Sequence, residues 1–175
     1  MATQKTIGWG AALSLGLWGL LSLPSAAAEN VLLRYRGFGR TVPVAELAEL
    51  AETGEPPRRL AALLRTAGQD PADLRRILTA EAGATPIALD RTLNSLTGEW
   101  VLDQLGTAIY PPSGQASRQA LRSALVASAQ DDNRVTLLEV LENYPGNQVV
   151  VNGNRLEEAY RQFQAFTQAG RGWLF

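Results

Sequence analysis

The sequence predicts an α+β fold that is mainly helical, with about six to seven helices packed against a small three-stranded sheet. Two short alternating runs, Val31–Arg36 and Arg40–Val42, flank Gly37-Phe38-Gly39 and predict an N-terminal hairpin. Apolar residues then recur at helical spacing along most of the chain. Val149–Val151 is the only other strong strand signal. Because a lone hairpin is only marginally stable in water, we expect these strands to share one sheet, with the helices on one side.

The first 28 residues predict a secretory signal peptide. Lys5 supplies positive charge, Ile7–Leu23 is an apolar run, and Ala26-Ala27-Ala28 offers small residues for cleavage after Ala28. An uncleaved anchor is the alternative, since the run has the length of a short spanning helix. We expect export to the periplasm or extracellular space and no stable membrane span after cleavage. The remainder predicts one domain over residues 29–170 and an apolar tail over residues 171–175.

Proline, glycine and capping residues mark the first three helices. Pro43 fits the first turn of a helix that Gly54 ends, and Gly68 ends the next one. Asp70 and Pro71 then provide an N-cap and a first helical position. The apolar positions of these helices are Val44, Leu47, Leu50, Ala51, Leu60, Leu63, Leu64, Leu74, Ile77 and Leu78.

The later helical patterns are separated by clear breaks. Thr85-Pro86 opens one stretch, Thr97 is expected to cap the next, and the break Tyr110–Gly114 precedes an Ala- and Leu-rich helix from Ser117 to Ala129. Thr136-Leu137-Leu138-Glu139 has the spacing of a capping box. The apolar positions are Leu89, Leu93 and Leu96, then Val101, Leu105 and Ile109, and finally Leu156, Tyr160 and Phe163 in a last helix after Asn152-Gly153-Asn154.

The composition excludes several classes of enzyme. The chain has no His and no Cys, so it can supply neither a Ser-His-Asp triad nor a cysteine nucleophile, nor a zinc or copper site built on imidazole or thiolate. Lys5 is the only lysine, and its loss with the signal would remove Ser-Lys and Schiff-base chemistry. With 16 basic and 17 acidic side chains, the chain carries no electrostatic footprint for nucleic acid. We expect no cofactor and no metal.

Carboxylates are the groups that could still support catalysis, so a carboxylate-dependent hydrolase without a triad is the alternative function. Glu46, Glu49 and Glu52 lie three apart on one predicted helix, but charges opposite an apolar stripe are typical of a solvated face. Glu157-Glu158 is interpreted in the same way. Asp131-Asp132-Asn133 lacks the spacing of a calcium loop and predicts a solvated turn. Ser113-Gly114 has no base beside it and predicts a turn before a helix.

Four residues are candidates for interaction, and none is a candidate for catalysis. Arg34 and Arg36 are expected on one strand face, where they could grip a phosphate or carboxylate or else cover the sheet and pair with acids. Trp173 and Phe175 make the chain end apolar, which is unusual. They could dock back on the domain or contact a partner or a membrane surface.

Three stretches carry a family resemblance: VLLRYRGFGRTVPVAELAELAETGE, LNSLTGEWVLDQLGTAIYPPSGQASRQALRSALVASAQDD and TLLEVLENYPGNQVVVNGNRL. Together they resemble the N-terminal domain of unknown function that precedes α/β-hydrolase catalytic domains in cyanobacteria. The resemblance covers roughly Glu29 to Phe166 and rests on the hairpin, the acidic helix after it, the Pro-Ser-Gly break and the Tyr-Pro turn before the late strand.

The resemblance implies an exported accessory or interaction module rather than an enzyme. In the longer relatives a hydrolase domain follows, whereas this chain has no G-x-S-x-G nucleophile motif and no His. We therefore expect a stand-alone copy that acts on a separate hydrolase or binds an envelope component or a small apolar ligand between its helices.

Overall fold

The computed structural model describes residues 27–171, without the side chains of residues 157, 160 and 169–171. The described residues form eight helices and six strands, so the predicted mainly helical α+β class is confirmed. In chain order the elements are β1 (Asn30–Tyr35), β2 (Phe38–Pro43), α1 (Val44–Thr53), α2 (Arg58–Ala67), α3 (Pro71–Thr79), β3 (Ala82–Gly83), α4 (Pro86–Leu93), α5 (Leu96–Ala108), β4 (Ile109–Tyr110), α6 (Arg118–Ser128), β5 (Arg134–Val135), α7 (Leu137–Glu142), β6 (Gln148–Asn152) and α8 (Gly153–Arg171).

The main sheet joins both ends of the domain, in the order β2-β1-β6-β4. β1 and β2 are antiparallel, and β6 runs parallel to β1 with Val31 opposite Val149. The predicted pairing of Val149–Val151 with the hairpin is therefore confirmed. The sheet has one strand more than predicted, because β4 pairs with the other edge of β6. β3 and β5 form a separate two-stranded ribbon.

The hairpin turn is tighter than the sequence predicts. Its two central residues are Arg36 and Gly37, with φ of 46° and 84°, whereas Phe38 and Gly39 already belong to β2. Two residues with positive φ match the right-handed twist of the flanking strands, which favours this type of turn. Arg36 therefore leaves the strand and does not share a face with Arg34.

The inner strand β6 is buried on both of its faces. Val149, Val150 and Val151 are each at most 2% exposed, and successive side chains of a strand point to opposite faces. Both α5 and α8 contact β6.

Short polar side chains begin most of the helices. Asp70, Thr85 and Ser117 each accept a hydrogen bond from a backbone N–H two or three residues on. The predicted capping box is present, with Glu139 Oε2 accepting from the Thr136 backbone N–H at 2.8 Å. The predicted cap of α5 is wrong: Ser95, not Thr97, accepts from the Gly98 N–H at 3.1 Å.

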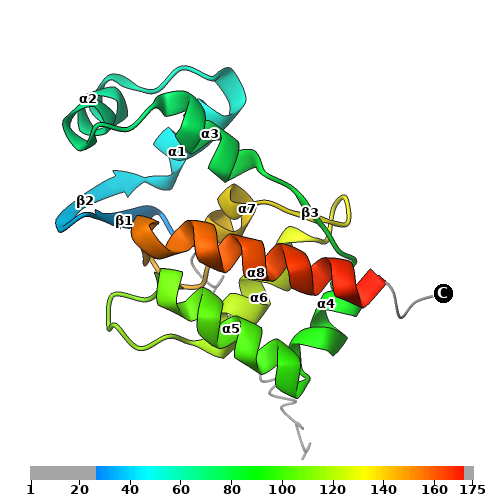
Figure 1. Cartoon of the computed structure of the whole chain (residues 1–175). Coiled ribbons are helices and arrows are strands. Elements are labelled where there is room, and N and C mark those ends of the chain that lie inside the picture. Colours follow the sequence, from blue (N-terminus) through cyan, green and yellow to red (C-terminus); the bar gives the residue numbers. More distant parts are fainter. Residues whose placement is uncertain (1–26, 172–175) are drawn as a thin grey trace, which may run out of the picture.

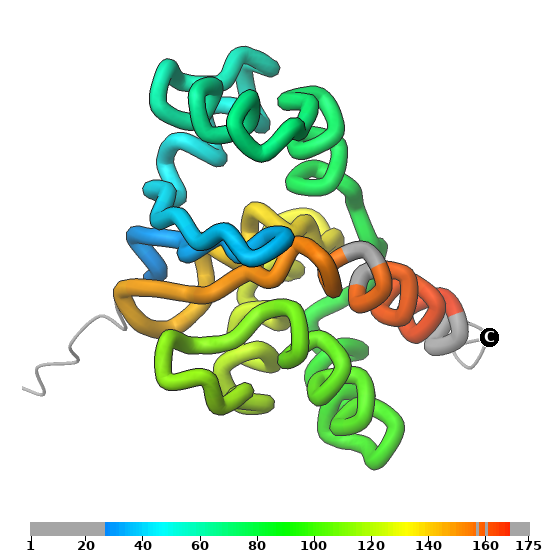
Figure 2. Tube along the Cα trace, turned by 60° about the vertical axis from the view of Figure 1, so that its left-hand side comes forward, coloured from blue at the N-terminus to red at the C-terminus, as the bar shows by residue number. Residues whose placement is uncertain are grey.

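The helices lie on two sides of α8. In Figure 1, α8 crosses the middle of the molecule, with α2 and α3 above it and α5 below it. The turned view in Figure 2 keeps the same segments at opposite ends of the molecule. Within residues 27–171, the structure contains no helix that is long and apolar enough to cross a membrane.

Candidate functional site

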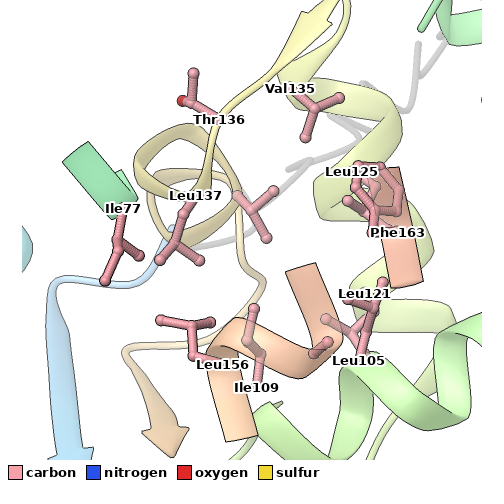
Figure 3. A pocket seen from close by; sticks show the side chains of 12 residues that line it. Ile77, Leu105, Ile109, Leu121, Leu125, Val135, Thr136, Leu137, Leu156 and Phe163 are labelled. Carbon is pink, nitrogen blue, oxygen red and sulfur yellow. The ribbon is translucent and has the colours of Figure 1, made fainter. Parts of the chain in front are cut away.

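The first candidate site is an apolar cavity with a volume of about 50 Å³. Its walls come from α3, α5, β4, α6, β5, α7 and α8, and Figure 3 shows their side chains arranged around one space. The cavity is surrounded mainly by leucine, isoleucine, valine and phenylalanine side chains, and Ile77, which is 39% exposed, is the most accessible of them. The lining residues are Ile77, Leu105, Ile109, Leu121, Leu125, Val135, Thr136, Leu137, Val140, Leu156, Ala159 and Phe163.

Thr136 is the single polar residue of this lining. Its hydroxyl is already committed to the capping box, because it donates to Glu139 Oε2 at 2.8 Å and accepts from the Glu139 N–H at 3.2 Å. A buried water needs two to four polar partners, so this space favours a hydrocarbon occupant over water. No ionisable side chain lines the cavity, so it offers no group for acid–base or nucleophilic catalysis.

The second candidate site is a groove of about 360 Å³ between the edge strand β2 and helix α2. Two guanidinium side chains, Arg40 and Arg59, line it together with the carboxylate of Glu46. The remaining lining residues are Thr41, Val42, Leu60, Ala62, Leu63 and Thr66. The groove is therefore amphipathic, and it shares no residue with the apolar cavity.

The two arginines predicted for interaction are separated by different partners. Arg34 Nη1 donates to the Tyr110 hydroxyl at 3.4 Å, across the sheet. The Arg36 guanidinium lies 5.2 Å from the centroid of the Tyr35 ring, which is within cation–π range. Neither residue lines the cavity or the groove. The arginines that do line the groove, Arg40 and Arg59, carry no sequence signal that separates them from other exposed arginines.

The predicted interaction residues Trp173 and Phe175 lie outside the described residues. The structure instead exposes an apolar stripe that the sequence analysis missed. Leu96 is 88% and Trp100 is 54% exposed, one turn apart on α5. Leu96 was expected to pack inward, but the Ser95 cap makes it the first residue of α5 and turns it to solvent.

The three acids of α1 do not share one environment. Glu49 and Glu52 are exposed, as predicted for a solvated face. Glu46 is half-buried, and its Oε2 atom is buried without a hydrogen-bond partner. Since a helix turns about 100° per residue, a spacing of three places these side chains on neighbouring but different lines of the surface.

Another pair of acids lies on α7, outside both hollows. Burial and the nearby charge of Glu139 raise the pKa of Glu142, which is a feature of many general acids. However, Glu139 is held by the Thr136 capping box, and neither acid lines the cavity or the groove. The geometry therefore gives this pair no enclosed space in which to act on a substrate.

The other polar features match their predicted structural roles. In the Asp131–Asn133 turn, Asp132 accepts from the Arg134 N–H at 2.9 Å, and the described residues contain no cluster of three or more potential metal ligands. Ser113-Gly114 is a turn closed by the Gly114 N–H donating to Pro111. On the surface, Arg118 forms salt bridges of 2.7 and 2.6 Å with Glu99 and Asp103, and its hydrogen bond lowers the pKa of Asp103.

The comparison with protein families assigns the chain to a family. A family model described as an α/β hydrolase of unknown function (DUF1400) matches residues 27–152. The chain belongs to this family. No curated protein and no solved structure matches the chain.

Membership of the DUF1400 family confirms the resemblance found in the sequence, since the matched residues include the hairpin, four of the cavity-forming helices (α3, α5, α6 and α7) and the strand β6. It also associates the domain with α/β hydrolases, while leaving its function undefined. The hydrolase chemistry in the family's description needs a nucleophile and a base, and this chain has no histidine to serve as that base.

Proposed function

We propose that this chain is an exported, non-catalytic accessory domain of the DUF1400 family that binds the hydrocarbon part of an amphiphile. The observation that carries the proposal is the apolar cavity, whose lining contains eleven apolar residues and one hydroxyl that is already hydrogen-bonded. A hydrocarbon chain gains about 0.8 kcal/mol for each methylene group that leaves water, and it makes no demand on polar partners.

The volume of the cavity restricts its occupant. About 50 Å³ is roughly a third of the ~150 Å³ of an engineered aliphatic cavity that binds benzene. The site therefore suits the end of an unbranched chain better than a ring. Movement of the partly exposed Ile77 side chain would lengthen the space toward the surface, where the polar part of the amphiphile would stay in water.

As an accessory domain, the chain would present such an amphiphile to a separate α/β hydrolase, which would supply the nucleophile and the base. This assignment is supported by the family description and by the absence of histidine from the sequence. We expect no turnover of short- or long-chain acyl esters by the purified chain. Ester hydrolysis that copurifies with the chain through several different columns would contradict the non-catalytic assignment.

The binding proposal can be tested with sodium octanoate and ¹³C-methyl NMR of the leucine residues. We expect octanoate to shift the methyl resonances of Leu105, Leu121 and Leu137, which line the cavity. Ala159→Leu would fill the cavity from α8 and weaken binding at least about tenfold. Ala165→Leu is the matched control, because Ala165 is exposed on the same helix and should leave binding unchanged. Equal binding by both variants would exclude the cavity as the site.

A further inference from the structure

The groove between β2 and α2 contains charges that the protein does not pair. Arg40 and Arg59 form no salt bridge within residues 27–171, and the one hydrogen bond of the Arg40 guanidinium goes to the Gly39 carbonyl at 3.0 Å. Glu46 Oε2 is buried without a hydrogen-bond partner. A buried acceptor left unsatisfied costs about 1–3 kcal/mol, and more when it is charged. The groove therefore places two exposed guanidinium groups that have no acidic partner among the described residues beside a half-buried carboxylate with one unsatisfied oxygen.

The backbone of β2 adds a donor and an acceptor beside these side chains. The Val44 N–H donates to the Glu29 carbonyl at 2.9 Å, one position beyond the Asn30–Pro43 pair of the β1–β2 register, so this position of the ladder is a hydrogen-bonded one. Hydrogen-bonded pairs alternate along an antiparallel ladder. Thr41 therefore directs its N–H and C=O away from β1, toward the open edge where the groove lies.

One wall of the groove is apolar. Leu60 is fully buried, Leu63 is half-buried, and both face the groove from α2, opposite Val42 of β2. The volume of about 360 Å³ lies within the range of small-molecule sites. An apolar wall beside fixed charges favours a ligand with a small apolar body and a charged head.

From these observations we propose that the groove binds a small zwitterion that carries a primary ammonium group and an anionic group on an apolar body. The ammonium group would donate to Glu46 and to the Thr41 carbonyl. The anion, a carboxylate or a phosphate, would accept from Arg40 and Arg59, whose planar guanidinium groups suit such oxygens. A simple anion would leave the Glu46 carboxylate unpaired, and a simple cation would meet two positive side chains. The proposal is independent of the apolar cavity, since the two sites share no residue.

The test is a titration of the ¹⁵N-labelled domain with four probes. L-leucine carries both charges on an apolar body, phosphoethanolamine carries an ammonium group and a phosphate, 4-methylpentanoate lacks the ammonium group, and 3-methylbutylamine lacks the anion. We expect at least one zwitterion to shift the amide resonances of residues 40–46 and 59–66. Each probe with a single charge should bind at least about tenfold more weakly than the zwitterion that binds more tightly. Preference for L-leucine would identify an amino-acid or peptide source, and preference for phosphoethanolamine would identify a phosphate headgroup.

Two pairs of variants test whether Glu46 and Arg59 bind the charged groups of the ligand. Glu46→Gln should weaken zwitterion binding at least about tenfold and leave 4-methylpentanoate unaffected, whereas Arg59→Gln should weaken both. Glu49→Gln and Arg58→Gln are the matched controls, because both residues are exposed and neither lines the groove. No shift with any probe at tens of millimolar, shifts outside the groove, or equal loss in the control variants would overturn the proposal.

Discussion

The body of the molecule, where α4 to α8 pack together and α5 and α8 contact β6, differs from the end where the hairpin and α2 border one groove. In the body the hollow space is small, apolar and surrounded by seven elements. At the hairpin end it is several times larger, charged and bordered by one edge strand, α1 and α2. The contrast indicates that the two regions are under different physical demands, close packing in the body and access to solvent at the hairpin end.

The glycines show the same contrast. A Cβ on Gly98 would meet the Thr92 carbonyl oxygen and would lie 2.5 Å from Leu93 Cα, so α4 and α5 approach each other backbone to backbone. At the hairpin end, a Cβ on Gly37 or Gly68 would meet no atom within 4 Å. Gly98 therefore serves close packing in the body, and Gly37 and Gly68 supply positive φ angles in turns of the hairpin end, as Gly114 and Gly146 do in turns elsewhere.

The largest expected effect is a difference in folding stability between two leucine-to-alanine variants, one in each region. Leu121→Ala should destabilise the fold by about 3 kcal/mol, because Leu121 is fully buried and its removal enlarges a cavity that already exists. Leu63→Ala in the groove wall should cost about 1 kcal/mol, since Leu63 is already half-solvated. Urea unfolding followed by circular dichroism measures both variants. Equal losses of unfolding free energy in the two variants would mean that the groove wall is packed as tightly as the body. The proposed difference in packing between the two regions would then be wrong.

A second pair of variants measures the close approach of α4 and α5. Gly98→Ala should destabilise the fold by about 2 kcal/mol, since overpacking outweighs the gain of about 1 kcal/mol in helix propensity. Gly39→Ala should range from neutral to about 0.5 kcal/mol stabilising, because its nearest contact would be Leu32 Cδ1 at an ordinary 3.8 Å. Thermal unfolding should separate the two by several degrees. A neutral Gly98→Ala would show that α4 can move away without cost.

The smallest effect concerns a buried hydroxyl in the body. Tyr144 is fully buried, and its hydroxyl has no hydrogen-bond partner. Removing the hydroxyl with Tyr144→Phe should stabilise the fold by about 1 kcal/mol at pH 7, because the variant leaves no polar atom unsatisfied. The control Tyr110→Phe loses only a 3.4 Å contact with Arg34 and should change stability little.

Burial also raises the pKa of Tyr144, which predicts a pH dependence. The phenol ionises near pH 10 in the unfolded chain and at higher pH in the folded protein. The native state is therefore unaffected below about pH 10 and loses stability as the pH rises from the unfolded toward the folded pKa. The melting-temperature advantage of Tyr144→Phe should grow above pH 10. A constant advantage would mean that the hydroxyl is exposed to solvent or bonded in solution.

The sequence by itself determined the elements and the chemistry that they exclude. The alternation in Val31–Tyr35, the β-branched run Val149–Val151 and the apolar helical stripes predicted where strands and helices form, because periodicity reports which side of an element is buried. The Thr136–Glu139 capping box was also predictable, since a cap depends on side chains and backbone within one turn. The absence of His and Cys excluded triads and thiolate sites without any knowledge of the fold.

Only the tertiary structure decided which neighbours each element has. β4 has two residues and no pattern of its own, so it is a strand solely because β6 lies beside it. The difference between Glu46 and Glu49 is likewise invisible along the chain, since it depends on how α1 is placed against β2 and α2. Both hollows are built from residues distant in sequence, and periodicity carries no information about such pairings. The arrangement of apolar and charged space that suggests function is therefore a property of the packed domain.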